Sequence, residues 1–210
     1  MNVPRTTGYF GGDKFAKKYP EVQNLIAGIN SIPLPLVPGY ANYPGHTVFW
    51  NEAIDIKADA LGWDLQPKVD TLPNPKAKWR GDHFMQMPDD LRVFCEIEYG
   101  NSASLFRDFA KFDLASKLET YDFFLLGVPG PNAKREIGYA TSFDHVLNNR
   151  EYMKHFVNSP CCVFEIEPAS HVDLITGSTM TLNDINDRMS QQQAHDLIDN
   201  HNLRPLLNLP

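Results

Sequence analysis

Three carboxylates have the spacing needed for joint chemistry. Glu96 and Glu98 lie one residue apart in "RVFCEIEYGN" (92–101), a run otherwise rich in strand-forming residues. Because side chains on a strand alternate between its two faces, the two glutamates point the same way. Asp82 lies fourteen residues before Glu96, on the first strand of a predicted hairpin whose second strand carries the glutamates. Folding the hairpin brings Asp82 alongside them.

Carboxylates that converge on one point repel each other unless something positive lies between them. A hard dication such as Mg²⁺ takes oxygen ligands and keeps several waters, and we expect Mn²⁺ to substitute for it. The predicted ligands are Asp82 and Glu96, whereas Glu98 is a second ligand or helps to activate the attacking water. Such a site suits phosphodiester hydrolysis, because the metal polarises a phosphoryl oxygen and lowers the pKa of a bound water.

The alternative is a solvated strand with no metal. Glu-x-Glu is common on exposed strands, and the chain holds a second copy, Glu165 and Glu167 in "VFEIEP", which we expect at the surface. Asp89 and Asp90 compete with Asp82 as the partner carboxylate. An aspartate that follows proline in a turn usually just satisfies backbone groups, which favours Asp82.

The elements that must position these residues can be read from periodicity and from Pro and Gly. Strands that alternate with helices indicate an α/β fold. The pattern predicts a helix over 13–31 interrupted at Pro20, an irregular connection over 32–45, a helix over 47–61 and a loop over 64–78. It then predicts a hairpin over 81–99, a helix over 101–118, a buried strand over 121–128, a helix over 143–156, a strand over 161–167 and a polar helix over 181–202.

Composition limits the class of protein. The 210 residues, 42% of them hydrophobic, predict one compact domain over 1–210. The net charge of −7 counts against a general nucleic-acid coat but allows a cleft with local basic groups and bound cations. Three cysteines without CxxC spacing are expected to be reduced thiols. With no membrane-length apolar run and no signal peptide, we expect a cytoplasmic protein that makes no membrane contact.

"VFCEIEYGNSASLFRDFAKF" followed by "YDFFLLGVP" resembles the BamHI, BglII and BstYI group of type II restriction endonucleases, within the PD-(D/E)xK nuclease superfamily. "WNEAIDIKADALGW" (50–63) looks like the helix that precedes the catalytic hairpin in that group. The similarity covers residues 50–167. It implies a restriction-endonuclease-like fold with a central mixed β-sheet flanked by helices, a catalytic core over about 47–167 and a C-terminal helix over 181–202.

The resemblance also implies roles for the acidic residues. Glu96 takes the place of the metal-binding Glu, and Glu98 takes a position that is Lys in most of the superfamily but Glu in this branch. Asp82 takes the place of the metal-bridging Asp, although the hairpin turn is shorter here than in that branch. Glu52 or Asp59 would supply an additional carboxylate from the preceding helix.

DNA contacts are expected at the start of the 101–118 helix. By resemblance, Asn101 and Arg107 fall where the group places DNA-contacting residues, but the serine expected between them is Ala103 here. From the residues alone, Asn101, Ser102 and Ser104 are donors near the positive end of a helix dipole, where a phosphate can bind.

Other basic and polar residues are further candidates. Arg107 can reach a guanine edge, although a salt bridge to Asp108 or Asp113 is the alternative. Lys111 is expected to touch a phosphate or to remain solvated. By resemblance, the 129–142 loop helps to read bases, and an exposed loop is the alternative; its candidate contacts are Tyr139, Thr141 and Ser142.

Taken together, the resemblance implies a type II site-specific deoxyribonuclease. It would hydrolyse phosphodiester bonds of double-stranded DNA at a short palindromic site with Mg²⁺ and leave 5′-phosphate and 3′-hydroxyl ends. A palindromic site implies a homodimer, and the resemblance implies a cognate DNA methyltransferase in the cell. The alternatives are a structure-directed repair or recombination nuclease of the same fold and a non-catalytic DNA-binding protein.

Overall fold

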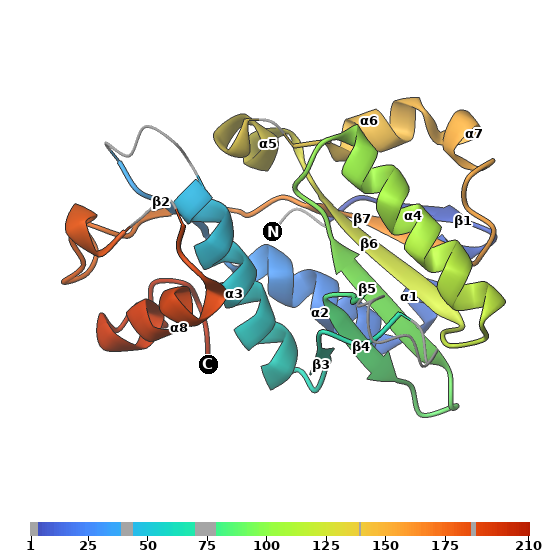
Figure 1. Cartoon of the computed structure of the whole chain (residues 1–210), viewed down its shortest axis with the longest axis horizontal. Helices are drawn as coiled ribbons and strands as arrows, with labels where there is room; N and C mark the ends of the chain where they lie inside the picture. Colours follow the sequence, from blue (N-terminus) through green and yellow to red (C-terminus); the bar gives the residue numbers. More distant parts are fainter. Residues whose placement is uncertain (1–3, 39–43, 70–78, 139, 186–187) are drawn as a thin grey trace.

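A mixed six-stranded sheet forms the centre of the structure (Figure 1). The computed structural model describes residues 4–38, 44–69, 79–138, 140–185 and 188–210. The strand order is β1-β7-β6-β5-β4-β3. The strands are β1 (Thr6–Tyr9), β3 (Asp64–Leu65), β4 (His83–Gln86), β5 (Arg92–Ile97), β6 (Phe123–Pro129) and β7 (Cys161–Ile166).

The middle of this sheet is parallel and its margins are antiparallel. β5, β6 and β7 run parallel, β1 pairs antiparallel with β7, and the β4–β5 hairpin continues antiparallel to β3. A strand in the middle of a parallel sheet is covered on both faces, which explains the continuous apolar sequence of β6, every residue of which is buried. The predicted mixed α/β sheet is thus confirmed.

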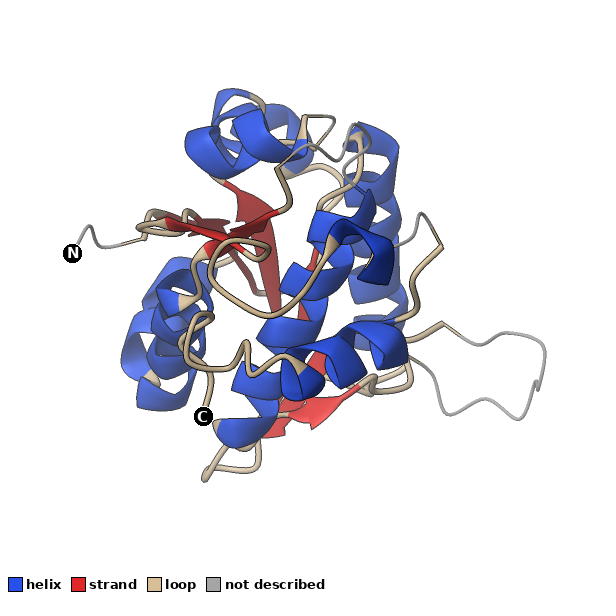
Figure 2. Cartoon of the chain, turned by 90° about the vertical axis from the view of Figure 1, so that its left-hand side faces the viewer, coloured by secondary structure: helices blue, strands red, loops and turns tan. Residues whose placement is uncertain are grey.

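Helices pack on both faces of the sheet and enclose two hydrophobic clusters (Figures 1 and 2). One cluster lies under α4 (Ser102–Lys117), α6 (Phe143–Asn148) and α7 (Arg150–Met153). The other lies under α1 (Gly12–Lys18), α2 (Pro20–Ser31), α3 (Pro44–Ala60), α5 (Pro131–Ile137) and α8 (Gln191–Asn200). A small parallel pair, β2 (Leu34–Leu36) and β8 (His171–Asp173), stands apart from the main sheet.

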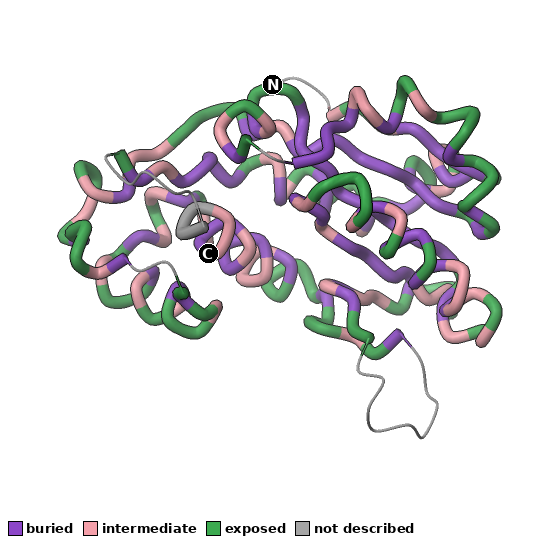
Figure 3. Tube along the Cα trace, turned by 45° about the horizontal axis from the view of Figure 1, so that its top comes forward, coloured by how far each residue is buried: buried purple, intermediate pink, exposed green. Residues whose placement is uncertain are grey.

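Alternation along β5 divides its residues between the two clusters. Phe94 packs against Phe112 of α4, with ring centroids 6.0 Å apart, whereas Val93 and Cys95 belong to the cluster on the opposite face. The buried stretch in Figure 3 follows the central strands. Glu96 lies two residues after Phe94 and therefore points to the same face of the sheet, toward α4. The basic groups near Glu96 are supplied by α4.

Some predicted boundaries are confirmed and others are wrong. Pro20 separates α1 from α2 and occupies the first turn of α2, where a missing N–H costs nothing. The predicted helix over 143–156 is two short helices. The predicted C-terminal helix over 181–202 begins only at Gln191, because Ser190 and Gln193 form a capping box that starts it there. Residues 182–184 form a separate 3₁₀ turn.

Four strands were not predicted: β1, β2, β3, which lies at the start of the predicted 64–78 loop, and β8. β1 is only four residues long, and β2 lies inside the 32–45 segment expected to be irregular. β2 tolerates Pro35 because it is paired on one side only, with β8. No helix in the described part of the chain is both long and apolar enough to cross a bilayer.

Candidate active site

A pocket of about 290 Å³ lies beyond the end of β5, between the hairpin, α3 and α4. It collects the three predicted carboxylates and two cations from α4. Its lining residues are Thr47, Asn51, Asp82, Glu96, Ile97, Glu98, Tyr99, Gly100, Arg107 and Lys111.

The hairpin places Asp82 beside Glu96, as the spacing predicts. The amide of Asp82 donates to the carbonyl of Cys95 at 3.1 Å, which fixes the register at this point. The Oδ2 of Asp82 accepts from the amide of Ile97 at 2.6 Å. Asp82 is therefore held by the backbone of the strand that carries Glu96, and its partly buried carboxylate lines the same pocket.

Glu96 meets a lysine from α4. Its carboxylate is buried, and Oε1 accepts from Lys111 Nζ at 2.8 Å. The same ammonium lies 3.1 Å from Asp108 Oδ1, one helical turn earlier on α4. Lys111 is itself buried, so it is not the solvated cation of the sequence-based alternative.

Glu98 is held at both oxygens. Oε2 accepts from Arg107 Nη2 at 2.8 Å, and Oε1 accepts from the amide of Gly100. Arg107 also reaches Asp108, with Nε 3.4 Å from Oδ1, so the salt-bridge alternative for this residue is confirmed. The arginine side chain is nevertheless 55% exposed at the pocket mouth and can meet a ligand there.

Burial sets the protonation of the site. It raises the pKa of Glu96 to about 9, and the nearby Asp82 carboxylate adds to the rise, whereas Lys111 opposes it. Burial and a hydrogen bond with Asp108 raise the pKa of Glu98 to about 7, against the amide of Gly100 and Arg107. Burial also raises the pKa of Asp82. Without added positive charge, the acidic residues of this pocket hold protons that they would lose in water.

The donor set suits a hard cation. Asp82 and Glu96 are the carboxylates that could hold Mg²⁺, since both line the pocket and their mutual repulsion favours a positive ion between them. Within the described ranges, no three His, Cys, Asp or Glu side chains come together as a metal-binding group. A metal held by Asp82 and Glu96 would take its remaining ligands from backbone oxygens, waters or a phosphate.

The polar residues at the start of α4 serve the helix itself. Asn101 is the N-cap: its side chain accepts from the amides of Ala103 at 2.9 Å and Ser104 at 3.4 Å. Asn101 and Ser102 are exposed and Ser104 is partly exposed, but none of the three lines the pocket. Their role in DNA binding stays a prediction.

The 129–142 segment is only partly available for contacts. Thr141 and Ser142 are both buried; the Thr141 amide donates to the carbonyl of Gly100, and the Ser142 side chain accepts from the His145 amide to cap α6. Neither side chain is presented at the surface as an exposed loop would present it. Tyr139 lies outside the described residues.

The additional carboxylate from α3 is not in the pocket. Glu52 is buried against α8, where its Oε1 lies 2.7 Å from His195 Nδ1, and Asp59 is exposed near the end of α3. The residue that α3 does send to the pocket is Asn51, together with Thr47. The expectation for Glu52 fails because its face of the helix packs on α8 rather than on the hairpin.

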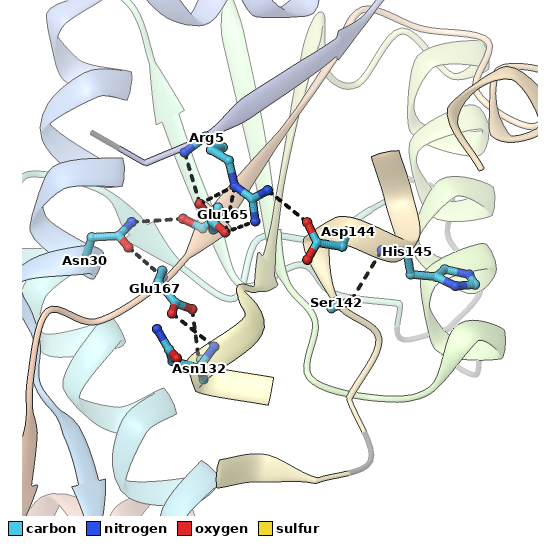
Figure 4. Close-up of polar contacts among 9 residues, drawn as sticks. Arg5, Asn30, Asn132, Ser142, Asp144, His145, Glu165 and Glu167 are labelled. Carbon is cyan, nitrogen blue, oxygen red and sulfur yellow. Dashed lines mark hydrogen bonds and ion pairs between the residues drawn. The ribbon is translucent and has the colours of Figure 1, made fainter. Parts of the chain in front are cut away.

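The second Glu-x-Glu pair is structural (Figure 4). Glu165 is buried, not at the surface, and it binds the guanidinium of Arg5, which also reaches Asp144 at 2.8 Å. Glu167 accepts from the amides of Asn132 and Ala133 at the start of α5. Both carboxylates line a separate hollow of about 950 Å³, away from the carboxylates of the hairpin.

Asp108 binds both cations of the site, but the sequence indicated it only as an alternative partner of Arg107, and its contact with Lys111 was not predicted. A signal was present, because Asp108 and Lys111 are three residues apart on one helix and therefore lie on the same side. Nothing in the sequence indicated that this side would turn toward Glu96. That depends on how α4 crosses the sheet.

No protein-family model and no curated protein matches the chain. Among solved structures, it is similar to the restriction endonuclease BglII complexed with a DNA 16-mer, with 12% identity, a TM-score of 0.56, and 80% of this chain and 77% of that chain covered. Free BglII aligns with 14% identity, a TM-score of 0.51 and 79% of each chain covered. At such identities the likeness concerns the fold. The chain has a restriction-endonuclease-like α/β fold, with a central mixed sheet flanked by helices.

Proposed function

We propose that the chain is a type II restriction endonuclease that cleaves double-stranded DNA at a short palindromic site with Mg²⁺. The observation that carries the proposal is the pocket in which Asp82 and Glu96 lie together beside Lys111, in a fold shared with a DNA-bound endonuclease. Oxygen ligands and fixed cations in one pocket suit a phosphodiester, which brings negative charge and needs it neutralised.

Each pocket residue then has a defined task. Asp82 and Glu96 would hold the ion, which when bound polarises the phosphoryl group and acidifies a water. Glu98, with a pKa of about 7, can accept the proton that the attacking water loses. The water oxygen bonds to phosphorus as the bond from phosphorus to the 3′ oxygen breaks. The 3′ oxygen takes a proton from solvent, which leaves 3′-hydroxyl and 5′-phosphate ends.

The proposal extends to assembly and context. A palindromic site is matched by a two-fold symmetric enzyme, so we propose a homodimer in which each subunit cuts one strand. Such an activity would cut the host's own DNA, so a cognate methyltransferase in the cell is part of the proposal. Arg107, exposed at the pocket mouth, is the residue best placed to meet the DNA.

Glu96→Gln tests the proposal directly. The amide keeps the size of the side chain but removes a charged oxygen ligand, so cleavage of plasmid DNA in Mg²⁺ should fall by roughly 10³-fold or more. Binding of the same DNA, measured by fluorescence anisotropy, should remain. The wild-type chain should give discrete fragments, and sequencing their ends identifies the site.

The second Glu-x-Glu pair supplies a matched control. Glu167→Gln changes the same residue type in the same motif but outside the pocket, and it should cleave like the wild-type chain. A smear in place of discrete fragments would point to the structure-directed nuclease. If the wild-type chain binds DNA and never cuts it, the protein is a binding protein and the proposal is wrong.

A further inference from the structure

Lys111 is the least expected member of the pocket. A lysine on the DNA-facing side of a nuclease can bind phosphate from the surface, and such a lysine would be solvated. Here the side chain is only 11% exposed and its ammonium lies between Glu96 at 2.8 Å and Asp108 at 3.1 Å. Lysine is seldom buried unless it is paired, so the position is built for this charge.

Stability alone is a weak reason for this arrangement. Buried ion pairs often contribute nothing net, because desolvation of the charges offsets their attraction. The Lys111–Asp108 pair could be replaced by apolar residues if α4 needed only to pack on β5. The pair does, however, keep a positive charge at the pocket wall next to a proposed ligand of the ion.

The charge of the pocket favours a single divalent ion. With every group ionised, the pocket and its direct partners hold two more negative than positive charges, an excess that one divalent ion balances. The acidic groups are Asp82, Glu96, Glu98 and Asp108, and the basic groups are Arg107 and Lys111. A second dication would give these six groups an excess of two positive charges.

We propose that the Lys111 ammonium takes the place of a second metal ion in the site. Each subunit then binds a single divalent ion, and Lys111 contacts the phosphate on the side opposite that ion. This rests on the proposed nuclease function. As the water oxygen attaches to phosphorus, negative charge builds on the non-bridging oxygens. The Lys111 ammonium, held in the buried wall of the pocket, stabilises this charge. No proton or electron is transferred to Lys111.

The test must separate this role from simple neutralisation of Asp108. Lys111→Met alone leaves the buried Asp108 carboxylate without the lysine that it pairs with. We therefore combine it with Asp108→Asn, which restores the net charge of the cluster. We expect the double variant D108N/K111M to fold normally by circular dichroism and to bind one Mn²⁺ per chain by electron paramagnetic resonance. Its single-turnover cleavage of a plasmid at saturating Mg²⁺ should still be at least about 100-fold slower than that of the wild-type chain.

A matched pair on the same helix is the control. Asp113 and Lys117 form an ion pair at 2.6 Å, with the lysine exposed, and D113N/K117M should cleave within about threefold of the wild-type rate. The inference is overturned if D108N/K111M cleaves at the wild-type rate, if it loses Mn²⁺ binding, or if the wild-type chain binds two Mn²⁺. Each of these results leaves the nuclease proposal standing, because that proposal is tested separately, by the fragments that the wild-type chain produces and by the loss of cleavage in Glu96→Gln.

Discussion

Glu96 is the residue at which fold and proposed chemistry conflict. A carboxylate at 4% exposure, close to Asp82, is costly to ionise, and a single hydrogen-bonded lysine does not cancel that cost. A strand that served only the fold would have no need of a glutamate at this buried position. Residues whose environment works against their charged form are typical of functional sites, and this supports the metal-binding role proposed for Glu96.

The high pKa of Glu96 predicts a specific pH dependence of stability. Its pKa is about 9 in the folded chain against an ordinary value of 4.5, so between these pH values the folded chain binds more protons than the unfolded chain. The free energy of unfolding therefore decreases as pH rises through this range. Glu96→Gln should remove part of the decrease, about 1–3 kcal/mol between pH 5.5 and 8.5, in urea titrations without divalent ions.

The control for this titration is Glu119→Gln, at an exposed position beyond α4. It should follow the wild-type curve at both pH values. If Glu96→Gln also follows the wild-type curve, then Glu96 is ionised in the folded chain across the whole range, and the argument from burial is wrong.

The sequence predicted that the three carboxylates of the pocket lie together, but it did not predict their cationic partners. Strand alternation was enough to place Glu96 and Glu98 together, and the hairpin was enough to bring Asp82 to them. The partners of these acids were not predictable, because Lys111 and Arg107 reach them only through the rotation of α4 about its own axis. An amphipathic pattern fixes that rotation only roughly.

Among the elements, α4 supplies both cations of the pocket, Arg107 and Lys111. Asn101 starts it by accepting hydrogen bonds from the amides of Ala103 and Ser104. A cap that fixes the first turn of α4 also fixes where the Arg107 side chain, nearly two turns later, extends from the helix toward the pocket. Asn101 therefore affects the site even if it never touches DNA.

Substitutions at Asn101 separate capping from DNA contact. Asn101→Ala should lower the free energy of unfolding by about 1 kcal/mol, because two amides lose their acceptor. Asn101→Asp should keep the stability, because the carboxylate caps equally well and favours the helix N-terminus, but it should weaken DNA binding by adding a negative charge. Urea titration and anisotropy measure the two effects separately.

Ser102→Ala is the control, since Ser102 is exposed and is not the cap. It should leave stability nearly unchanged. Equal loss of stability in Asn101→Ala and Asn101→Asp would show that the cap geometry does not hold in solution.

Elements with strong local signals were predicted well. The buried β6, the α1–α2 break at Pro20 and the length of α4 all depend on residues within a few positions of each other. The missed strands β1 and β2 are defined by distant partners, because β1 pairs with β7 and β2 pairs with β8. A strand of three or four residues has too few side chains to show a period of its own.

At the scale of the whole molecule, Arg5 connects the segment before β1 to β7 and α6. Its guanidinium binds Glu165, 160 positions later in the sequence, and also Asp144 before β7 (Figure 4). It also lies over the ring of Phe143, 5.1 Å from the ring centre. No local pattern in the sequence could have predicted this pairing.

Arg5→Met should destabilise the chain by about 1–3 kcal/mol, because it leaves the buried Glu165 carboxylate without its partner. The exposure of the arginine, 45% of its side chain, keeps the loss below that of a fully buried pair. Urea titration measures it. Arg5→Met combined with Glu165→Gln should recover most of the loss, and failure to recover would mean that the contact with Phe143 matters more than the ion pair.

The position of the pocket charges along the chain has a further consequence. Every charged side chain that lines the pocket comes from the segment 82–111, which is the hairpin and the first part of α4. The proposed chemistry would thus be carried by one contiguous stretch, and residues outside it complete the fold around the pocket. Under the proposed function, exchanging loops outside this stretch with those of nucleases of the same fold should change the preferred DNA sequence and leave cleavage itself intact.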